Sequence, residues 1–285
     1  MTSFATSFVT SKWQSLVPFL QNLTQQVGDR LLMDFDTARV AIEKDDGSLV
    51  TKSDQWADEY IRTALGQEFP NYDVLTEESS QILTHREWSW VVDPLDGTTN
   101  FARGIPIWGI SIGLLHFGTP VFGYIAMPPL RQHIYGWFDG DDVAAFMNGR
   151  SLHLPKHLES SDVQLDHLAN YFFSACSRSL EKIGKSKFPF KLRMLGAASY
   201  NLLTVGLGST IGAIEATPKI WDIAAVWVIL QATGVTWIYL DADWHIIDHI
   251  FPLALDKNYQ QQSFPSLVVR HPQLVAIAKQ IILDH

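Results

Sequence analysis

Hydrophobic residues recur at helical spacing near the beginning of the chain. Apolar side chains three and four positions apart predict a helix over residues 8–34, in which Pro18 either kinks the helix or lies near its first turn. A turn is expected at residues 45–48, and a second helix is predicted to start at Ser53 or Asp54 and to end before Pro70. Its predicted buried face comprises Ala57, Tyr60, Ile61, Ala64 and Leu65.

The middle of the chain changes to short apolar runs separated by turn residues. Strands are predicted over residues 105–115, 121–126, 134–138 and 143–146. A polar stretch at residues 155–166 follows, and then strands over 171–175, 210–215 and 235–240 alternate with helices over 197–205 and 222–232. We therefore expect an α/β (α+β) protein with an N-terminal half, residues 1–160, and a C-terminal half, residues 161–285, joined as one compact unit.

The composition is that of an ordered globular protein. Hydrophobic residues make up 47% of the 285 residues and charged residues 18%. The single cysteine, Cys176, excludes an internal disulfide and suits a reducing compartment, and its apolar neighbours predict a buried, inert thiol. The chain has neither a signal-peptide pattern nor an apolar run of roughly 20 residues, the length that spans a bilayer. We expect a cytoplasmic protein without a membrane partner.

The charge pattern opposes nucleic-acid binding. The formal net charge is −9, and basic residues occur only in scattered pairs. An acidic protein can still act on phosphate esters if a bound metal ion reverses the local field. A zinc site at His245 and His249 is disfavoured, because Asp241 and Pro252 interrupt that segment.

The most informative segment is residues 90–101, WVVDPLDGTTNF. An apolar strand-like run ends at Asp93, and a tight turn places Asp96 three residues later. Two carboxylates on one short loop repel each other unless a cation lies between them, and oxygen ligands favour magnesium or calcium. The Thr-Thr-Asn run that follows offers backbone N–H groups to an anion if a helix starts there. Adjacent cation and anion sites indicate phosphate chemistry.

Two distant segments join this motif: Glu77 in residues 75–79, LTEES, and Asp222 in residues 220–225, IWDIAA. With Asp54, residues 196–198 and Glu215, they form an ordered set over roughly residues 45–235, in which the chain resembles the inositol monophosphatase family of magnesium-dependent, lithium-sensitive sugar phosphatases. The resemblance implies a layered α/β/α/β/α sandwich of the inositol monophosphatase and fructose-bisphosphatase type.

The resemblance also implies a metal centre with two or three magnesium ions. Glu77, Asp93 and the backbone carbonyl of Leu95 would hold one ion. Asp93, Asp96 and Asp222 would hold a second. Two such ions can stabilise both the attacking and the leaving oxygen of a phosphoryl displacement.

The remaining implied roles concern water, phosphate and alcohol. Thr98 is expected to contact the phosphate and the attacking water, with Asp54 as partner of its hydroxyl, so that Asp54, Glu77 and Thr98 form the catalytic set. The N–H groups of Gly97 and Thr98 would bind phosphate oxygens. By resemblance, the substrate-binding residues on the alcohol side are Asp96, Ala198 through its backbone, Glu215 and Asp222.

Two assignments have alternatives in the sequence itself. Asp54 is equally well explained as a helix N-cap or as a catalytic residue, and it can be both. Glu215 is explained equally well as a surface carboxylate or as a substrate contact. The chain also departs from the family pattern: Thr76 stands where a glycine is common, and Pro218 and Lys219 stand where animal relatives carry Gly and His. These departures leave the expected metal ligands in place and bear on which substrate the protein selects.

The function predicted from these residues is magnesium-dependent hydrolysis of a small polyol phosphate monoester, with myo-inositol 1-phosphate as the first candidate. Rival substrates on the same scaffold are fructose 1,6-bisphosphate, histidinol phosphate and a 3′-phosphorylated nucleotide. The Thr98-Thr99-Asn100 run argues against the nucleotide, whose phosphatases usually carry Lys after the first Thr. A non-catalytic, metal-binding regulatory protein would be expected to lack a ligand. A homodimer and lithium sensitivity are implied by the resemblance alone.

Overall fold

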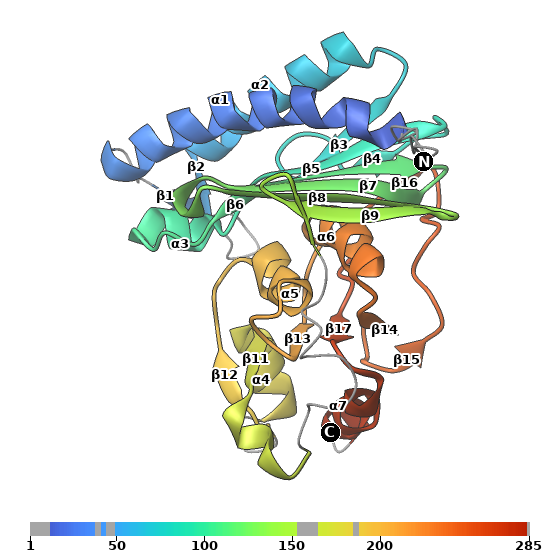
Figure 1. Ribbon diagram of the computed structural model, residues 1–285. Helices are drawn as coiled ribbons and strands as arrows, with labels where there is room; N and C mark the ends of the chain where they lie inside the picture. Colours follow the sequence, from blue (N-terminus) through green and yellow to red (C-terminus); the bar gives the residue numbers. More distant parts are fainter. Residues whose placement is uncertain (1–11, 38–40, 44–48, 153–164, 185–187, 284–285) are drawn as a thin grey trace, which may run out of the picture.

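The computed structural model describes residues 12–37, 41–43, 49–152, 165–184 and 188–283. Helices and sheets alternate in five layers, as the family resemblance predicts (Figure 1). The layers are a helix pair, a seven-stranded sheet, a second helix pair, a six-stranded sheet and a final helix pair. Each sheet is thus covered by helices on both faces, which explains the long apolar runs in the sequence.

Helices α1 (Leu16–Thr37) and α2 (Lys52–Glu68) form the first layer, and a short 3₁₀ helix, Lys12–Ser15, precedes α1. Pro18 lies in the first turn of α1, where a proline is tolerated. The beginning of the predicted helix, residues 8–11, lies outside the described residues. The predicted start of α2 at Ser53 or Asp54 is wrong by one or two positions, because Thr51 is the N-cap and Asp54 completes a capping box. Tyr60, predicted to be buried, is 37% exposed.

The seven-stranded sheet is antiparallel except for one parallel pair, β3–β5, and its order is β10-β9-β8-β7-β6-β5-β3. Its strands are β3 (Asp73–Thr76), β5 (Trp88–Asp96), β6 (Gly109–His116), β7 (Thr119–Met127), β8 (Gln132–Asp139), β9 (Asp142–Met147) and β10 (Arg150–Ser151). Three of the predicted strands agree with β7, β8 and β9 to within two residues. The strand predicted over residues 105–115 starts too early, because residues 105–108 form the connection from helix α3 (Thr98–Arg103).

Helices α5 (Ala198–Gly206) and α6 (Ile220–Thr233) lie between the two sheets (Figure 1). Ten of the fourteen residues of α6 are buried, because the large sheet contacts one face and α5 the other. Glycines in β6 and β7 allow this close approach. A Cβ on Gly123 would lie 2.2 Å from the carbonyl oxygen of Ala225, and a Cβ on Gly113 would lie 2.9 Å from the Cβ of Ala224.

The six-stranded sheet is mixed and has the order β12-β11-β13-β17-β14-β15. Its strands are β11 (Phe172–Ala175), β12 (Lys191–Arg193), β13 (Gly212–Glu215), β14 (Thr236–Leu240), β15 (Ile246–Ile247) and β17 (Ser266–Val269). Helices α4 (Ser177–Ile183) and α7 (Pro272–Leu283) contact this sheet and form the last layer (Figure 1). The sequence pattern predicted β11, β13, β14, α5 and α6, but it missed β12, β15, β17, α4 and α7.

Minor elements complete the chain: strands β1 (Ala41–Glu43), β2 (Leu49–Thr51), β4 (Ile82–Leu83) and β16 (Lys257–Asn258), and 3₁₀ helices Pro128–Leu130 and Leu165–Asn170. The turn predicted at residues 45–48 and most of the polar stretch at 155–166 lie outside the described residues. The division at residue 160 stays a prediction. Helix α6, from the predicted C-terminal half, packs against the sheet of the N-terminal half, so the two halves share a core.

Candidate active site

A cavity of about 480 Å³ opens where the end of β5, the beginning of α3, α5 and the loop before α6 meet. Its volume falls in the range of small-ligand sites, roughly 300–1,000 Å³. Nine of the ten predicted site residues line it: Glu77, Asp93, Leu95, Asp96, Gly97, Thr98, Ala198, Glu215 and Asp222. The tenth, Asp54, lies behind Thr98 and contacts it.

A β-bulge at the end of β5 places two carboxylates together. Asp93 pairs with Ser111 of β6, and Asp96 pairs with Gly109, so three steps along β5 match two along β6. Residues three apart in a regular strand point to opposite faces, and one extra residue restores them to the same face. The apolar run is buried in the core as far as Asp96, because every residue from Ser89 to Asp96 is buried.

Asp93, Asp96 and Asp222 form an acidic cluster in which one carboxylate oxygen of each lies within 4.8 Å of the others. Burial, followed by the charges of Glu77, Asp96 and Asp222, raises the pKa of Asp93 well above its ordinary value. Burial and the charge of Asp96 raise the pKa of Asp222 in the same way. Each carboxylate therefore opposes the ionisation of its neighbours, as expected of a site that is built for a cation.

Asp96 also joins the two halves of the site. Its oxygens accept hydrogen bonds from the backbone N–H of Ala198 at 2.9 Å and of Ser199 at 3.0 Å, and from the Ser199 hydroxyl. These N–H groups belong to the start of α5, where no residue of the same helix can accept from them. Burial raises the pKa of Asp96, and these hydrogen bonds offset part of the shift. Sequence reasoning identified Ala198 but missed Ser199, whose only signal is its place beside Ala198.

Glu77 approaches the acidic cluster from the end of β3. Its N–H donates to the carbonyl of Val92 at 3.2 Å, which places Glu77 beside Asp93. Glu77 is not one of the three mutually close carboxylates, although its charge raises the pKa of Asp93 and of Asp222. Thr76, the departure from the family pattern, accepts hydrogen bonds from the N–H groups of Ser79 and Ser80, so the threonine closes the turn that contains Glu77.

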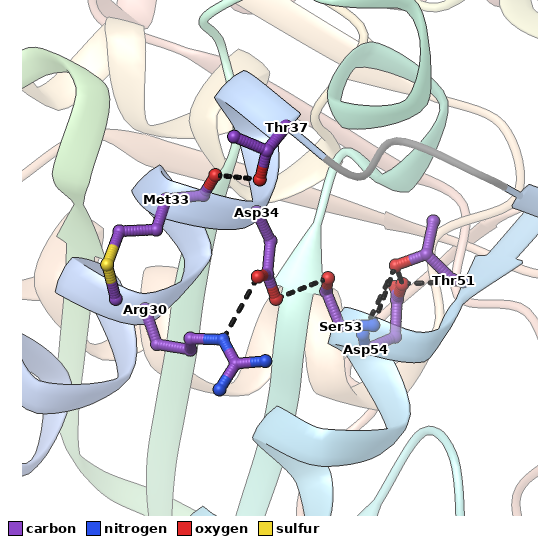
Figure 2. A network of polar contacts seen from close by, with 7 residues as sticks. All are labelled: Arg30, Met33, Asp34, Thr37, Thr51, Ser53 and Asp54. Carbon is purple, nitrogen blue, oxygen red and sulfur yellow. Dashed lines mark hydrogen bonds and ion pairs between the residues drawn. The ribbon is translucent and has the colours of Figure 1, made fainter.

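Asp54 is connected to the cavity through Thr98. The Thr98 hydroxyl lies 2.9 Å from Asp54 Oδ1 and 3.0 Å from the carbonyl of Leu95. The other Asp54 oxygen accepts from the N–H and the hydroxyl of Thr51 (Figure 2). Burial raises the pKa of Asp54 to about 6, and the hydrogen bonds from Thr51 and Thr98 limit the rise. Asp54 is thus part of a helix cap and a partner of Thr98 at once, and its catalytic role stays a prediction.

The polar contacts continue outward from Thr51 and Asp54 to helix α1 (Figure 2). The Ser53 hydroxyl donates to Asp34 Oδ2 at 2.9 Å, and the Arg30 guanidinium donates to Asp34 Oδ1 at 3.0 Å. This chain of contacts joins α1 to the first turn of α2, which carries Asp54. Sequence reasoning found neither Asp34 nor Ser53 in this role.

Glu215 and Cys176 line the side of the cavity that faces the smaller sheet. Glu215 is 4% exposed, so the interpretation of Glu215 as a surface carboxylate is wrong. Its carboxylate accepts from the Asn201 amide at 2.6 Å, and burial and then the neighbouring Cys176 raise its pKa well above the ordinary value. Cys176 is half-buried and lines the cavity, so the prediction of a buried thiol is correct only in part. Its position between β11 and α4 at the cavity wall leaves it accessible.

The histidines form no competing metal site among the described residues. His245 contacts Asp241 on an exposed turn, and neither it nor His249 belongs to a group of three metal-binding side chains in that part of the chain. The donor set of the acidic cluster, in contrast, consists of buried carboxylate oxygens that suit a hard divalent cation such as Mg²⁺. The residues present therefore fit the metal that the fold implies.

Comparison with known proteins agrees with this geometry. The sequence profile of the inositol monophosphatase family matches residues 12–267, and the chain belongs to this family. It is 29% identical to a fructose-1,6-bisphosphatase/inositol-1-monophosphatase of Aquifex aeolicus over 235 residues, which cover 77% of this chain and 86% of that protein. It is 32% identical to a histidinol-phosphatase of Mycobacterium tuberculosis over 198 residues, which cover 67% of this chain and 74% of that protein.

Solved structures show the same fold. The crystal structure of the extragenic suppressor protein suhB of Bartonella henselae superposes with a TM-score of 0.75 at 20% identity and covers 94% of this chain and 98% of that one. An inositol monophosphatase of Thermotoga maritima gives a TM-score of 0.72 at 22% identity, with 95% and 99% covered. The layered fold predicted from the sequence is confirmed.

Family membership makes the protein a phosphomonoesterase that acts on a phosphorylated small molecule. The family depends on magnesium, and the acidic cluster is the group of side chains that could hold it. The relatives differ in substrate at similar identity, so they do not select one. No helix in the described part of the chain is long and apolar enough to cross a membrane.

Proposed function

We propose that this phosphomonoesterase hydrolyses phosphate monoesters of small polyols with Mg²⁺ as its cofactor. The observation that carries the proposal is the acidic cluster of Asp93, Asp96 and Asp222 on the wall of the cavity that Thr98 also lines. Such a cavity would offer ligands for a cation, hydrogen-bond donors for the phosphate and hydroxyl-binding groups in one place. The choice of myo-inositol 1-phosphate in particular stays a prediction.

The metal-holding role falls to oxygen ligands alone. Asp93, Asp96 and Asp222, with Glu77 and the carbonyl of Leu95 beside them, would hold the magnesium ions. When bound, magnesium supplies positive charge that offsets the phosphoryl oxygens and makes water a better nucleophile at neutral pH. The mutually raised pKa values of the carboxylates support this role, because a divalent cation removes the repulsion that causes part of the shifts.

Thr98 and Asp54 would orient the water and receive its proton. A hydroxyl has one proton and two lone pairs. When Thr98 donates its proton to Asp54, the lone pairs of Thr98 are free to accept a hydrogen bond from water. With a pKa of about 6, Asp54 is mostly ionised at neutral pH and still basic enough to take a proton through Thr98.

The phosphate and the alcohol would occupy opposite sides of the acidic cluster. Gly97 and Thr98, at the start of α3, line the cavity, and their N–H groups would bind the phosphate oxygens. Glu215 and Ala198 also line the cavity, and they would contact the alcohol. A carboxylate suits a polyol, because it can accept hydrogen bonds from two adjacent hydroxyls.

A substrate panel with and without magnesium tests the proposal. Phosphate release would be measured from myo-inositol 1-phosphate, fructose 1,6-bisphosphate, histidinol phosphate and a 3′-phosphorylated nucleotide. We expect release from polyol esters that requires Mg²⁺ and stops on chelation. Preference for the nucleotide would overturn the substrate class. Magnesium binding without release from any ester would favour a regulatory protein instead.

A further inference from the structure

Asn201 is a buried polar residue in α5, and the metal and phosphate functions of the site do not involve it. The residue is 1% exposed and lies in the wall of the active-site cavity. A polar side chain that is buried this completely destabilises the fold unless its hydrogen-bonding groups have partners within the protein. The partners of the Asn201 amide therefore indicate what the residue does.

The oxygen of the Asn201 amide faces two donors. The Ser174 hydroxyl on β11 donates to Oδ1 at 2.7 Å, and the backbone N–H of Leu195 donates to the same atom at 3.2 Å. Because the Leu195 N–H can only donate, Oδ1 rather than Nδ2 must lie on this side. The amide nitrogen is consequently directed to β13, where it donates to Glu215 Oε1 at 2.6 Å. The backbone at Leu195 thus fixes which end of the amide meets Glu215.

The peptide segment at Leu195 is also held from α3. Its carbonyl accepts a hydrogen bond from the Asn100 amide at 2.6 Å, and the same amide nitrogen donates to the carbonyl of Ile107 at 2.8 Å. Asn100 lies on α3, the helix whose start would bind the phosphate. A continuous series of hydrogen bonds therefore runs from α3 through Leu195 and Asn201 to Glu215.

Glu215 needs such a donor, because no cation holds it. The residue is 4% exposed and forms no ion pair with any residue that the structure describes. A buried carboxylate in that situation depends on hydrogen-bond donors to stay ionised and to keep one orientation. The neighbouring thiol of Cys176 is a weaker donor than an amide, and it contacts the Ser179 hydroxyl at 3.1 Å.

The contacts of Asn201 assign it a role in recognising the alcohol. On the basis of the proposed function, we propose that Asn201 is a positioning residue for polyol recognition. It holds the Glu215 carboxylate in the orientation that accepts hydrogen bonds from the hydroxyls of the substrate. Asn201 acts on the substrate only through Glu215.

Two esters that differ in their hydroxyls test this inference. myo-Inositol 1-phosphate carries hydroxyls next to the ester and phenyl phosphate carries none, so the ratio of their kcat/KM values at saturating magnesium measures polyol recognition. N201D keeps the size of the side chain and the oxygen that faces Leu195 and Ser174, but it replaces the donor to Glu215 with a second carboxylate. We expect the ratio to fall about tenfold or more, chiefly through the KM of the inositol ester.

The matched control is S174A, which removes a contact at the other end of the same amide. The Leu195 N–H still fixes the amide in this variant, and the bond to Glu215 remains. The ratio should therefore stay near that of the unmodified protein. A ratio that persists in N201D, or that falls as far in S174A as in N201D, contradicts the proposal. Equal losses for the two esters in N201D would mean that Asn201 only supports the fold, which also contradicts it.

A double variant distinguishes positioning from direct contact with the substrate. E215A removes the carboxylate itself and should lower the ratio at least as much as N201D does. If Asn201 acts through Glu215, adding N201D to E215A should lower the ratio no further, because the two changes remove the same interaction. A further decrease would show that Asn201 contacts the substrate directly, and it would overturn the proposal.

The unmodified protein provides a measurement that does not depend on the folding of the variants. In protein with ¹⁵N-labelled asparagine, magnesium and phosphate, the side-chain NMR signal of Asn201 should shift when myo-inositol is added. The signal of Asn148, in the turn between β9 and β10, should not. An Asn201 signal that does not move overturns the proposal. Failure of the underlying function looks different, because the unmodified protein would then release no phosphate from the inositol ester with magnesium.

Discussion

The acidic cluster and the cap of helix α2 both bury carboxylates, but the two regions balance them differently. Asp54 has three donors, the N–H and hydroxyl of Thr51 and the hydroxyl of Thr98, and they limit the rise of its pKa. Asp93 has one backbone donor, Leu95, and three carboxylates that raise its pKa further. Hydrogen-bond donors can hold one buried charge, whereas a cluster of charges needs a cation.

The largest expected effect concerns the acidic cluster. Asp93→Asn should lower kcat/KM at least about a thousandfold, because it weakens the charge stabilisation that magnesium supplies. The same change should raise the melting temperature of the metal-free protein, since it removes a repelling charge, and should abolish further stabilisation by magnesium. Phosphate release and thermal melting with and without Mg²⁺ measure these effects.

The control is Asp241→Asn, which changes an exposed carboxylate that contacts His245 on a distant turn. We expect it to leave turnover and the response to magnesium unchanged. Magnesium-dependent turnover that survives in Asp93→Asn would refute the assignment of Asp93 as a ligand and, with it, the contrast between the two regions.

The next largest effect is the pH dependence of stability, which distinguishes the acidic cluster from the cap of α2. The buried carboxylates have raised pKa values, so the folded protein binds more protons than the unfolded chain above the ordinary pKa of 3.8. These groups therefore contribute most to the stability of the metal-free protein below about pH 4. Their contribution should be lost as the pH rises through the pKa values that they have in the folded protein. Asp54, with a shift from 3.8 to about 6, accounts for about 3 kcal/mol of this loss.

Urea unfolding with a chelator, at several values between pH 4 and pH 8, measures this slope. Magnesium should reduce the pH dependence that the acidic cluster contributes and should leave the pH dependence that Asp54 contributes unchanged. In the absence of metal, Asp93→Asn should reduce the pH dependence of stability that the acidic cluster contributes. A slope that magnesium does not alter would show that the two regions are not distinguished by their need for a cation.

A smaller effect is expected at the cap itself. Asp54→Asn should lower kcat by about a hundredfold, a typical contribution of general base catalysis, with unchanged magnesium affinity. In the unmodified enzyme kcat should fall as the pH decreases below about 6, because protonated Asp54 no longer accepts the proton of Thr98. This dependence should disappear in Asp54→Asn. Loss of magnesium binding in the variant would mean that cap and cluster act as one site.

The smallest effect concerns the outer contacts of the cap. Ser53→Ala removes the hydrogen bond to Asp34 and should cost about 1 kcal/mol of unfolding free energy, measured with urea. The donors to Asp54 itself remain, so kcat should change little. A decrease in kcat as large as that of Asp54→Asn would instead show that the position of α2 controls Thr98.

Much of the site could be predicted because its information is local in the sequence. The apolar run before Asp93, the turn to Asp96 and the helix start at Thr98 lie within a dozen residues, and each has a strong pattern. Asp222 at the beginning of an apolar helix has a similarly clear signal. The structure confirms that these segments meet at one cavity, whereas the individual catalytic roles stay predictions.

The features that the sequence did not predict depend on tertiary contacts. Glu215 is buried because Asn201 and the cavity wall surround it, which no local pattern records. The N-cap of α2 is Thr51, and Asp54, as the third residue of the helix, is its partner in the capping box. Strand β17 is only four residues long and lies between β13 and β14, so its pairing partners are distant in sequence.

The glycines beneath α6 have a consequence for the evolution of the metal centre. Asp222 and Asp93 belong to different elements, and their separation depends on how deeply α6 sits against the sheet at Gly113 and Gly123. A single added methyl group at Gly123 would meet the helix backbone at 2.2 Å and push α6 outward. Mutational tolerance should thus be lower under the middle of this helix than at many positions on the cavity rim, although no substrate atom ever reaches it.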